Sequence, residues 1–320
     1  MPKETARRPR TAVVVITLAV SLVLLSGGVW LLFARDTAPP CSDLTENPRV
    51  QKSVGEAVRS GMSCQALGEA IVKASVGDGQ GHHTLGQAQA LKDVLVVLGD
   101  QGTGGATLDP ALRRPLAAAL SNYAPDLHAM LGGIAVQDFV TKAASHEPPW
   151  ESEGTYHLTV LTDTLRNVLL EVSEDPHAYA ALRLAETRTT GQSLAAVHAD
   201  AKWYGLSVPP TESARALGAL DGIADAVTRD LGERQAQDWR AIVVDGLQDG
   251  RDSAGKGIAE TWLSDLHGAP EAQRYERLRT QGVDMTRLWA ERRNMDAPTR
   301  EGLLAQVERS ALTAYREIKP

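Results

Sequence analysis

The stretch HLTVLTDTLRNVLLEVSEDP, residues 157–176, decides the fold class because its apolar side chains recur every three or four residues. This spacing places them on one face of an α-helix. The face consists of Leu158, Leu161, Leu165, Val168, Leu169 and Val172. Polar side chains such as Asp163 and Arg166 fall on the other side. We therefore predict an amphipathic helix that packs on a core.

The end of this stretch, Asp175-Pro176, predicts the start of the next helix, because Asp caps helix N-termini and Pro fits the first helical position. The same pair recurs at Asp109-Pro110, and Pro210 is expected to open a further helix. Helical spacing continues through most of the chain after residue 48, and strand patterns are scarce. The sequence therefore predicts an all-α multi-helix bundle.

The stretch VLVVLGDQGTGGATL, residues 94–108, looks like the strand and glycine loop of a phosphate-binding site. The apolar residues before it, however, have helical spacing from Thr84 onward, which predicts a helix that Thr84 caps and Gly99 ends. Gly105 and Ala106 stand where a phosphate-binding loop needs Lys and a hydroxyl side chain. We therefore expect no nucleotide and no other cofactor.

The N-terminal segment 11–33 carries no charged side chain. As a helix it would be roughly 35 Å long, enough to cross the hydrocarbon core of a bilayer. A cleaved signal peptide is the alternative, but its apolar region is usually shorter. The basic side chains of residues 1–10 favour a cytoplasmic N-terminus. We therefore predict a single-pass protein of the cell membrane, with residues 34–320 extracytoplasmic.

The expected exported part divides at one stretch of broken helical pattern. Residues 34–48 read as a linker, and two prolines with three acidic residues interrupt the pattern at 145–154. We predict a helical sub-bundle at 49–144 and a second at 155–320, with 145–154 as a linker. The alternative is a single domain in which 145–154 is a long loop.

The charge of the exported part excludes one class of partner. Residues 1–33 carry a balance of +3, so the rest of the chain carries −10 of the total of −7. Nucleic acids and anionic lipid surfaces attract clustered Lys and Arg. We therefore expect no nucleic-acid partner, and contact with the membrane only through the anchor.

The two cysteines, Cys41 and Cys64, both lie in the expected exported part. An even number of cysteines outside the cytoplasm favours a disulfide, and only one pairing exists. A zinc site is the alternative, but no C-x-x-C pair accompanies these cysteines. We predict a Cys41–Cys64 disulfide near the membrane.

Motifs for catalysis or metal binding do not emerge from the sequence. His82 and His83 lie in a glycine-rich stretch that reads as a solvated loop, and the remaining histidines are expected at the surface or satisfied in the core. The stretch 245–257 fails as a calcium loop because Leu247 and Lys256 occupy ligand positions. No G-x-S-x-G motif is present. We predict no catalytic residue and no metal site.

The segment 158–247 resembles the C-terminal helical region of large secretion-associated proteins of high-GC bacteria that accompany type VII (WXG-type) secretion systems. The resemblance lies in VLLEVSEDPHAYAALRLAETRTTGQSL, residues 168–194, and TESARALGALDGIADAV, residues 211–227. It implies an interaction module of a secretion or polymorphic-toxin locus, and no catalytic residue transfers with it. This chain departs from that family because it is short and begins with an expected membrane anchor.

Taken together, the features above favour a membrane-anchored interaction or scaffold protein with an unidentified protein partner. A cell-envelope enzyme, such as a wall hydrolase, and a small-ligand-binding module are the alternatives. Aromatic side chains near predicted helix breaks are candidate contacts for the partner. These are Trp150, Tyr156, Trp203 and Tyr204, for which packing in the core is the alternative.

Overall fold

The computed structural model describes residues 41–77, 81–102, 107–133, 137–249 and 257–318. The expected membrane anchor therefore lies outside the described residues. Among those residues, no helix is both long enough and apolar enough to cross a membrane. Residues 41–320 form one compact unit.

The all-α prediction is confirmed: the described residues form fifteen α-helices, one 3-10 helix and one small sheet. The first elements are α2 (Ser42–Thr45), α3 (Pro48–Val54), the 3-10 helix η1 (Gly55–Ala57), α4 (Cys64–Val76), α5 (Leu85–Gly102), α6 (Pro110–Asn122), α7 (Ala124–Gly132) and α8 (Gln137–Thr141). A hairpin of β1 (Trp150–Ser152) and β2 (Thr155–His157) follows.

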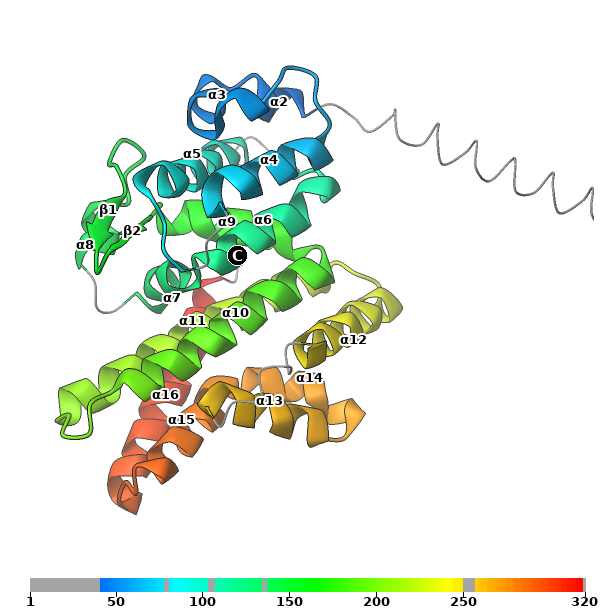
Figure 1. Cartoon of the computed structure of the whole chain (residues 1–320). Coiled ribbons are helices and arrows are strands. Elements are labelled where there is room, and N and C mark those ends of the chain that lie inside the picture. Colours follow the sequence, from blue (N-terminus) through cyan, green and yellow to red (C-terminus); the bar gives the residue numbers. More distant parts are fainter. Residues whose placement is uncertain (1–40, 78–80, 103–106, 134–136, 250–256, 319–320) are drawn as a thin grey trace, which may run out of the picture. The chain divides into compact units, whose positions relative to one another are not determined.

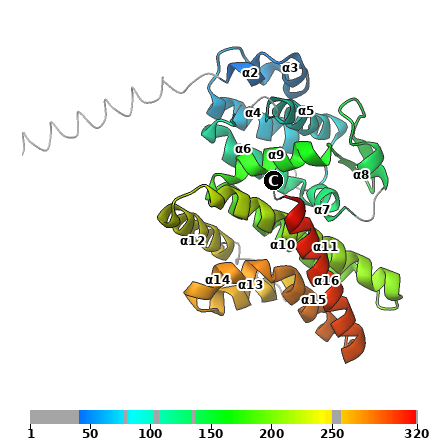
Figure 2. The same ribbon diagram turned by 180° about the vertical axis from the view of Figure 1, so that it is seen from behind.

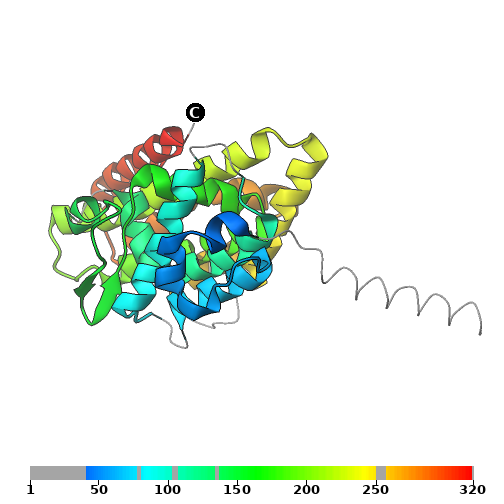
Figure 3. The ribbon, with the colours of Figure 1, turned by 90° about the horizontal axis from the view of Figure 1, so that it is seen from above.

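The remaining helices are α9 (Thr162–Ser173), α10 (Pro176–Ala196), α11 (Trp203–Arg229), α12 (Glu233–Asp249), α13 (Ile258–Gly268), α14 (Glu271–Arg279), α15 (Gln281–Arg292) and α16 (Ala297–Glu317). Figure 1 shows α10 and α11 side by side across the middle of the unit, with α4, α5, α6 and α9 on one side and α12 to α15 on the other. The view from above in Figure 3 shows α2 and α3, in blue, in front of the other helices. The long helices α10 and α11 therefore form the centre on which the others pack.

Helix caps appear where the sequence predicts them. Asp109 caps α6 and Asp175 caps α10, each accepting hydrogen bonds from backbone N–H groups of the first turn. Thr84 and Gln87 form a reciprocal capping box at the start of α5, with N–H to side-chain distances of 2.8 and 3.3 Å. These bonds fix the starts of three helices that pack in the core.

The helix of residues 157–176 is α9, and its buried face matches the predicted one from Leu165 to Val172. Leu161 is an exception, because it stands at the N-cap and is 57% exposed. The prediction that Leu161 belongs to the buried face is therefore wrong. The N-cap precedes the first helical turn, so its side chain does not follow the helical face.

Two predicted helix boundaries are wrong. Helix α5 continues past Gly99 to Gly102, and a Cβ on Gly99 would lie only 2.5 Å from Cγ2 of Thr164 on α9. This glycine permits close packing of two helices rather than ending one. Helix α11 begins at Trp203, not at Pro210, which lies inside it.

Helices before and after the predicted linker at 145–154 pack on each other, since α6 and α7 contact α10 and α5 contacts α9. The second half of that stretch forms β1 and the hairpin turn, in which Glu153 and Gly154 both have positive φ. Two such residues are typical of the tight hairpin turns that match the twist of the strands. The backbone N–H of Tyr156 donates to the carbonyl of His83 at 2.9 Å, which fastens the hairpin to the segment before α5.

The most extensive helix contact joins α11 to α16, which Figure 2 shows crossing each other. Gly218 and Gly222 of α11 face α16 here, and a Cβ on Gly218 would lie 2.3 Å from the carbonyl oxygen of Ala311. On Gly222 it would lie 2.8 Å from the carbonyl oxygen of Tyr315. The two backbones therefore approach more closely than any side chain at these positions would allow.

We expect Gly218→Ala to lower the free energy of unfolding by about 2 kcal/mol, because the added methyl group meets backbone and forces the helices apart. The matched control is Gly302→Ala in α16, where a Cβ meets nothing within 4 Å. That variant should gain up to about 1 kcal/mol from helix propensity. Urea unfolding measures both changes. Equal effects of the two substitutions would contradict the close packing of α11 on α16.

A buried arginine connects four helices of the central region. Arg183 of α10 is fully buried and donates to the carboxylate of Asp221 on α11 at 2.6 Å. It also donates to the side chain of Gln281 on α15 at 2.8 Å and to the carbonyl of Leu278 on α14 at 2.7 Å. Burial raises the pKa of Asp221 to about 6 despite the adjacent guanidinium. The guanidinium therefore replaces water for several buried acceptors at once.

Candidate functional site

Trp203 and Tyr204 form an exposed aromatic pair at the start of α11. Trp203 is 51% exposed and Tyr204 is 75% exposed, whereas Trp239, Trp262 and Trp289 are at most 4% exposed. Large apolar side chains that remain in water are a feature of surfaces that contact other molecules. We call the end of α10, residues 197–202 and the start of α11 the α10–α11 tip.

The position of the aromatic pair in the helix explains its exposure. Lys202 is the N-cap of α11, so Trp203 and Tyr204 are its first two helical residues. A helical side chain leans toward the N-terminus and covers the turn before its own Cα. In the first turn of a helix, no such turn exists for the side chain to cover. Both rings therefore lack a preceding turn of α11 to pack on.

The backbone of the α10–α11 tip is held from a neighbouring helix. The guanidinium of Arg293, at the C-cap of α15, donates to the carbonyls of Val197, His198 and Ala199 at 3.0, 2.8 and 2.9 Å. It also lies over the ring of Trp289, 5.2 Å from the centroid. One buried aromatic ring and three hydrogen bonds therefore support the loop that precedes the exposed pair.

The other two candidate contact residues lie in the β-hairpin and are half-buried. The rings of Trp150 and Phe139 meet edge-on with their centroids 4.9 Å apart. The ammonium of Lys142 lies 5.9 Å from the ring centroid of Trp150. Tyr156 packs against the hydrophobic core. The structure thus places Trp203 and Tyr204 together at one helix end, and Trp150 and Tyr156 on the paired strands.

The predicted disulfide between Cys41 and Cys64 is confirmed. Cys64 is the first residue of α4, and the backbone N–H of Cys41 donates to the carbonyl of Met62 at 3.2 Å. Both cysteines are buried in the hydrophobic core. The bond ties the beginning of the described chain to α4 and encloses α2, α3 and η1.

The prediction of a solvated loop at His82 and His83 is wrong for His83, which is only 8% exposed. Its ring stacks on Tyr123 with the centroids 3.6 Å apart, and its backbone N–H donates to the hydroxyl of Thr155 at 2.8 Å. Burial lowers the pKa of His83. Two hydrogen bonds join the backbone of His83 to the hairpin, which the sequence pattern does not indicate.

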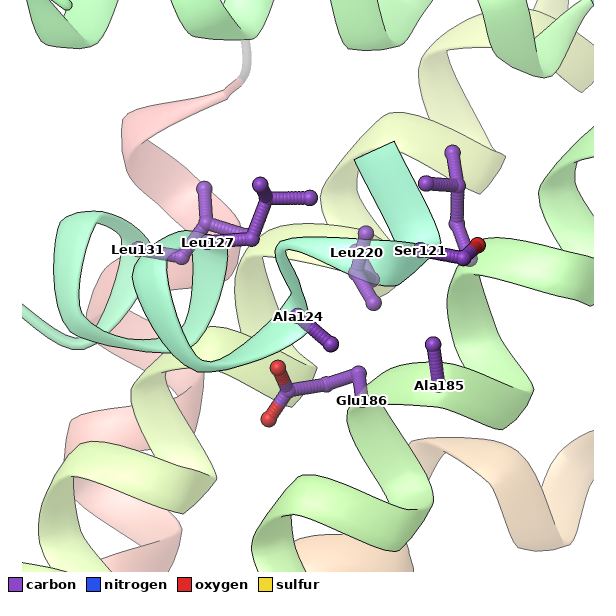
Figure 4. Close-up of a pocket in the computed structure, with 8 residues that line it drawn as sticks. Ser121, Ala124, Leu127, Leu131, Ala185, Glu186 and Leu220 are labelled. Atoms are coloured by element: carbon purple, nitrogen blue, oxygen red, sulfur yellow. The ribbon is translucent and has the colours of Figure 1, made fainter. Parts of the chain in front are cut away.

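Two further histidines pair with carboxylates around α7. His128 is buried and its Nδ1 lies 2.7 Å from Oε1 of Glu186 on α10. Figure 4 shows Glu186 beside a small cavity of about 10 Å³, which leucine and alanine side chains of α7, α10 and α11 also line. On the hairpin side, Nδ1 of His157 lies 2.6 Å from Asp126. Both pairs connect α7 to its neighbours.

The two pairs affect the pKa values of their histidines in the same direction. Burial alone would lower the pKa of His128, but the charge of Glu186 and its hydrogen bond outweigh burial and raise it. The hydrogen bond to Asp126 raises the pKa of His157. A raised pKa in the folded state stabilises the fold below the unfolded pKa, and this stability is lost as pH rises through the folded pKa.

We expect the free energy of unfolding to fall as pH rises above the unfolded histidine pKa of 6.5 and through the raised pKa values of His128 and His157, because both side chains lose their protons there. Burial lowers the pKa of His83 below 6.5 and that of Lys92 to about 8. Urea unfolding at several pH values measures the slope. The double variant His128→Gln, His157→Asn should flatten it, whereas His146→Asn, at an exposed site, should not. If the double variant keeps the same slope, groups other than His128 and His157 cause the pH dependence.

The described residues contain no group of three or more His, Cys, Asp or Glu side chains that could hold a metal ion. The carboxylates near the end of α9 have structural partners. Glu171 accepts from the backbone N–H of Leu108 at 3.0 Å, and Asp175 pairs with Arg114 at 2.7 Å. Glu174 pairs with Arg113. These carboxylates therefore fix α6 against α9 and the start of α10.

Of the surfaces described so far, the α10–α11 tip alone combines exposed aromatic rings with a backbone held from a neighbouring helix. The aromatic pair is visible in the sequence, but its support by Arg293 is not. Comparison of the chain with known protein families, with curated proteins and with solved structures finds no match.

Proposed function

We propose that this protein is a membrane-anchored, extracytoplasmic helical interaction protein that binds a protein partner through the α10–α11 tip. The observation that carries the proposal is the exposure of Trp203 and Tyr204, because the other Trp, Tyr and Phe side chains among the described residues are buried or half-buried. Tyr and Trp are enriched in protein interfaces, where they bury a large area at little cost in side-chain entropy.

The fixed backbone of the tip supports the same proposal. A surface that is already ordered loses less conformational entropy on binding. The bonds from Arg293 to three successive carbonyls provide this order. The polar side chains of Asp200 and Lys202 are exposed beside the aromatic pair, which suits an interface with an apolar centre and a polar rim.

The cellular setting rests on the sequence. The uncharged segment 11–33 and the basic side chains before it support a membrane anchor with a cytoplasmic N-terminus. The resemblance of residues 158–247 to type VII secretion-associated proteins supports a role as an accessory of a secretion or polymorphic-toxin system. In this proposal the anchor holds the helical unit at the outer face of the membrane, where it meets its partner.

Site-specific photocrosslinking in intact cells tests the proposal. We expect a photoreactive phenylalanine analogue at position 203 or 204 of the full chain to give a discrete adduct with one protein. The same analogue at Leu312, an exposed apolar position on α16, should not give it. Trp203→Ala with Tyr204→Ala should weaken binding of the captured protein by about 2 kcal/mol or more without lowering the thermal midpoint. Identical adducts at 203, 204 and 312, or none at 203 and 204, would refute the role of the tip.

A further inference from the structure

A surface cleft of about 1070 Å³ lies where α9 passes the C-terminal ends of α11 and α16. Its apolar lining comes from Leu170 on α9, Val227 at the end of α11, Leu231 just after it, and Ile318 at the end of α16. The first three of these side chains are half-buried. The cleft therefore presents accessible apolar surface within a concave site, as ligand-binding sites do.

The charged side chains of the cleft are mainly acidic. Five carboxylates and three arginines line it, and two of the arginines are already paired. Arg113 pairs with Glu174, and Arg166 pairs with Glu317 at 2.7 Å.

The remaining charges are the carboxylates Asp163, Glu171 and Asp230, and Arg229. Asp163 is 93% exposed and its nearest charged contact, with Arg166, is at 4.0 Å. Ile318 is the C-cap of α16, so the carbonyl end of that helix adds partial negative charge. The cleft therefore favours a cationic ligand with an apolar part.

We infer that this cleft binds a basic segment of a protein partner in which Lys or Arg side chains alternate with apolar ones. An extended segment of this kind places its apolar side chains on Leu170, Val227 and Leu231, while its cations reach Asp163 and Asp230 on the rim. Charge complementarity selects this partner over an acidic one. The cleft is slightly larger than the usual range for small-ligand sites, and this size suits a segment of several residues.

The cleft is distinct from the α10–α11 tip. Trp203 begins α11, and Val227 lies near the other end of the same helix. A helix rises about 1.5 Å per residue, so this separation is roughly 35 Å. The inference therefore adds a second contact surface and does not depend on the aromatic pair.

Fluorescence anisotropy with the full chain in a non-ionic detergent tests the inference. The probe is a fluorescein-labelled hexapeptide that alternates lysine with leucine, and the comparison probe alternates glutamate with leucine. We expect the lysine probe to bind and the glutamate probe not to bind. The variant Asp163→Asn, Asp230→Asn should bind the lysine probe about fivefold to tenfold more weakly. The matched control Asp265→Asn, Glu308→Gln removes the same charge from exposed positions outside the cleft and should bind as the wild type does.

A second pair of variants separates the cleft from general attraction to an acidic protein. Val227→Lys places a cation on the apolar lining and should abolish binding, whereas Leu312→Lys on α16 should not. Thermal unfolding verifies that each variant is folded. Equal binding by the cleft variants and their controls, or absence of binding by the wild type, would overturn the inference.

Discussion

Replacing Arg183 with Met is expected to lower the free energy of unfolding by about 3–5 kcal/mol, the largest loss that we predict for a single substitution. Methionine has a side chain of similar length without the guanidinium. The change leaves the carboxylate of Asp221 without its cation and removes the donors that satisfy Gln281 and the carbonyl of Leu278. A buried charge without a partner costs far more than the net gain from forming the pair.

A double-mutant cycle separates the uncompensated charge from the lost packing. Asp221→Asn in the Arg183→Met background removes the buried charge and should recover about 2 kcal/mol. Arg309→Met, at an exposed position of α16, should change stability by less than about 0.5 kcal/mol. Urea unfolding measures the wild type, Arg183→Met, Asp221→Asn, the double variant and Arg309→Met. If Arg183→Met is no more destabilising than Arg309→Met, Arg183 does not organise the four helices.

Removing the disulfide is expected to have the second-largest effect. Replacing Cys41 and Cys64 with Ser opens a loop with a sequence separation of 23 residues. The loop-entropy relation gives about 3 kcal/mol for a loop of this length. Replacing these cysteines should also lower the free energy of unfolding more than a substitution at the surface would, because both sulfurs are buried in the core.

Thiol labelling in cells and urea unfolding of the purified chain provide the measurements. If residues 34–320 are extracytoplasmic, both cysteines should resist alkylation until a reductant is added. The reduced wild type should unfold at the same urea concentration as the Ser variant, which serves as the control for reduction. Free thiols in intact cells would contradict the proposed location, whereas equal stability with and without the bond would contradict its structural role.

Local rules recover a large part of this fold from the sequence. Asp109, Asp175 and Thr84 mark three helix starts because a cap depends only on residues within one turn of it. The face from Leu165 to Val172 was predictable because a helix that packs on one side repeats its apolar residues.

Features that depend on distant segments escape these rules. Gly99 resembles a C-cap, but Thr164 on another helix is what requires a glycine there. Pro210 resembles a helix start, yet α11 includes it. Near this proline the hydroxyl of Thr211 donates to the carbonyl of Ser207 at 2.6 Å and supplies one local hydrogen bond. The ring of His83 is buried against Tyr123, which comes from a distant part of the sequence.

The two candidate surfaces also differ in how far the sequence predicts them. Trp203 and Tyr204 are recognisable in the sequence as aromatic side chains near a helix break, but their exposure follows from their place in the first turn of α11. The cleft could not be predicted, because its lining comes from α6, α9, α11 and α16 together. About half of the residues around Arg183 are polar, but in the structure other helices surround α10.

The packing of α11 on α16 also bears on how the chain acquires its fold during synthesis. The ribosome releases α11 before the residues that form α16, so Gly218 and Gly222 emerge before the helix that packs on them. Contacts so far apart in the sequence close late. The centre of the unit therefore completes only after residue 317 has emerged.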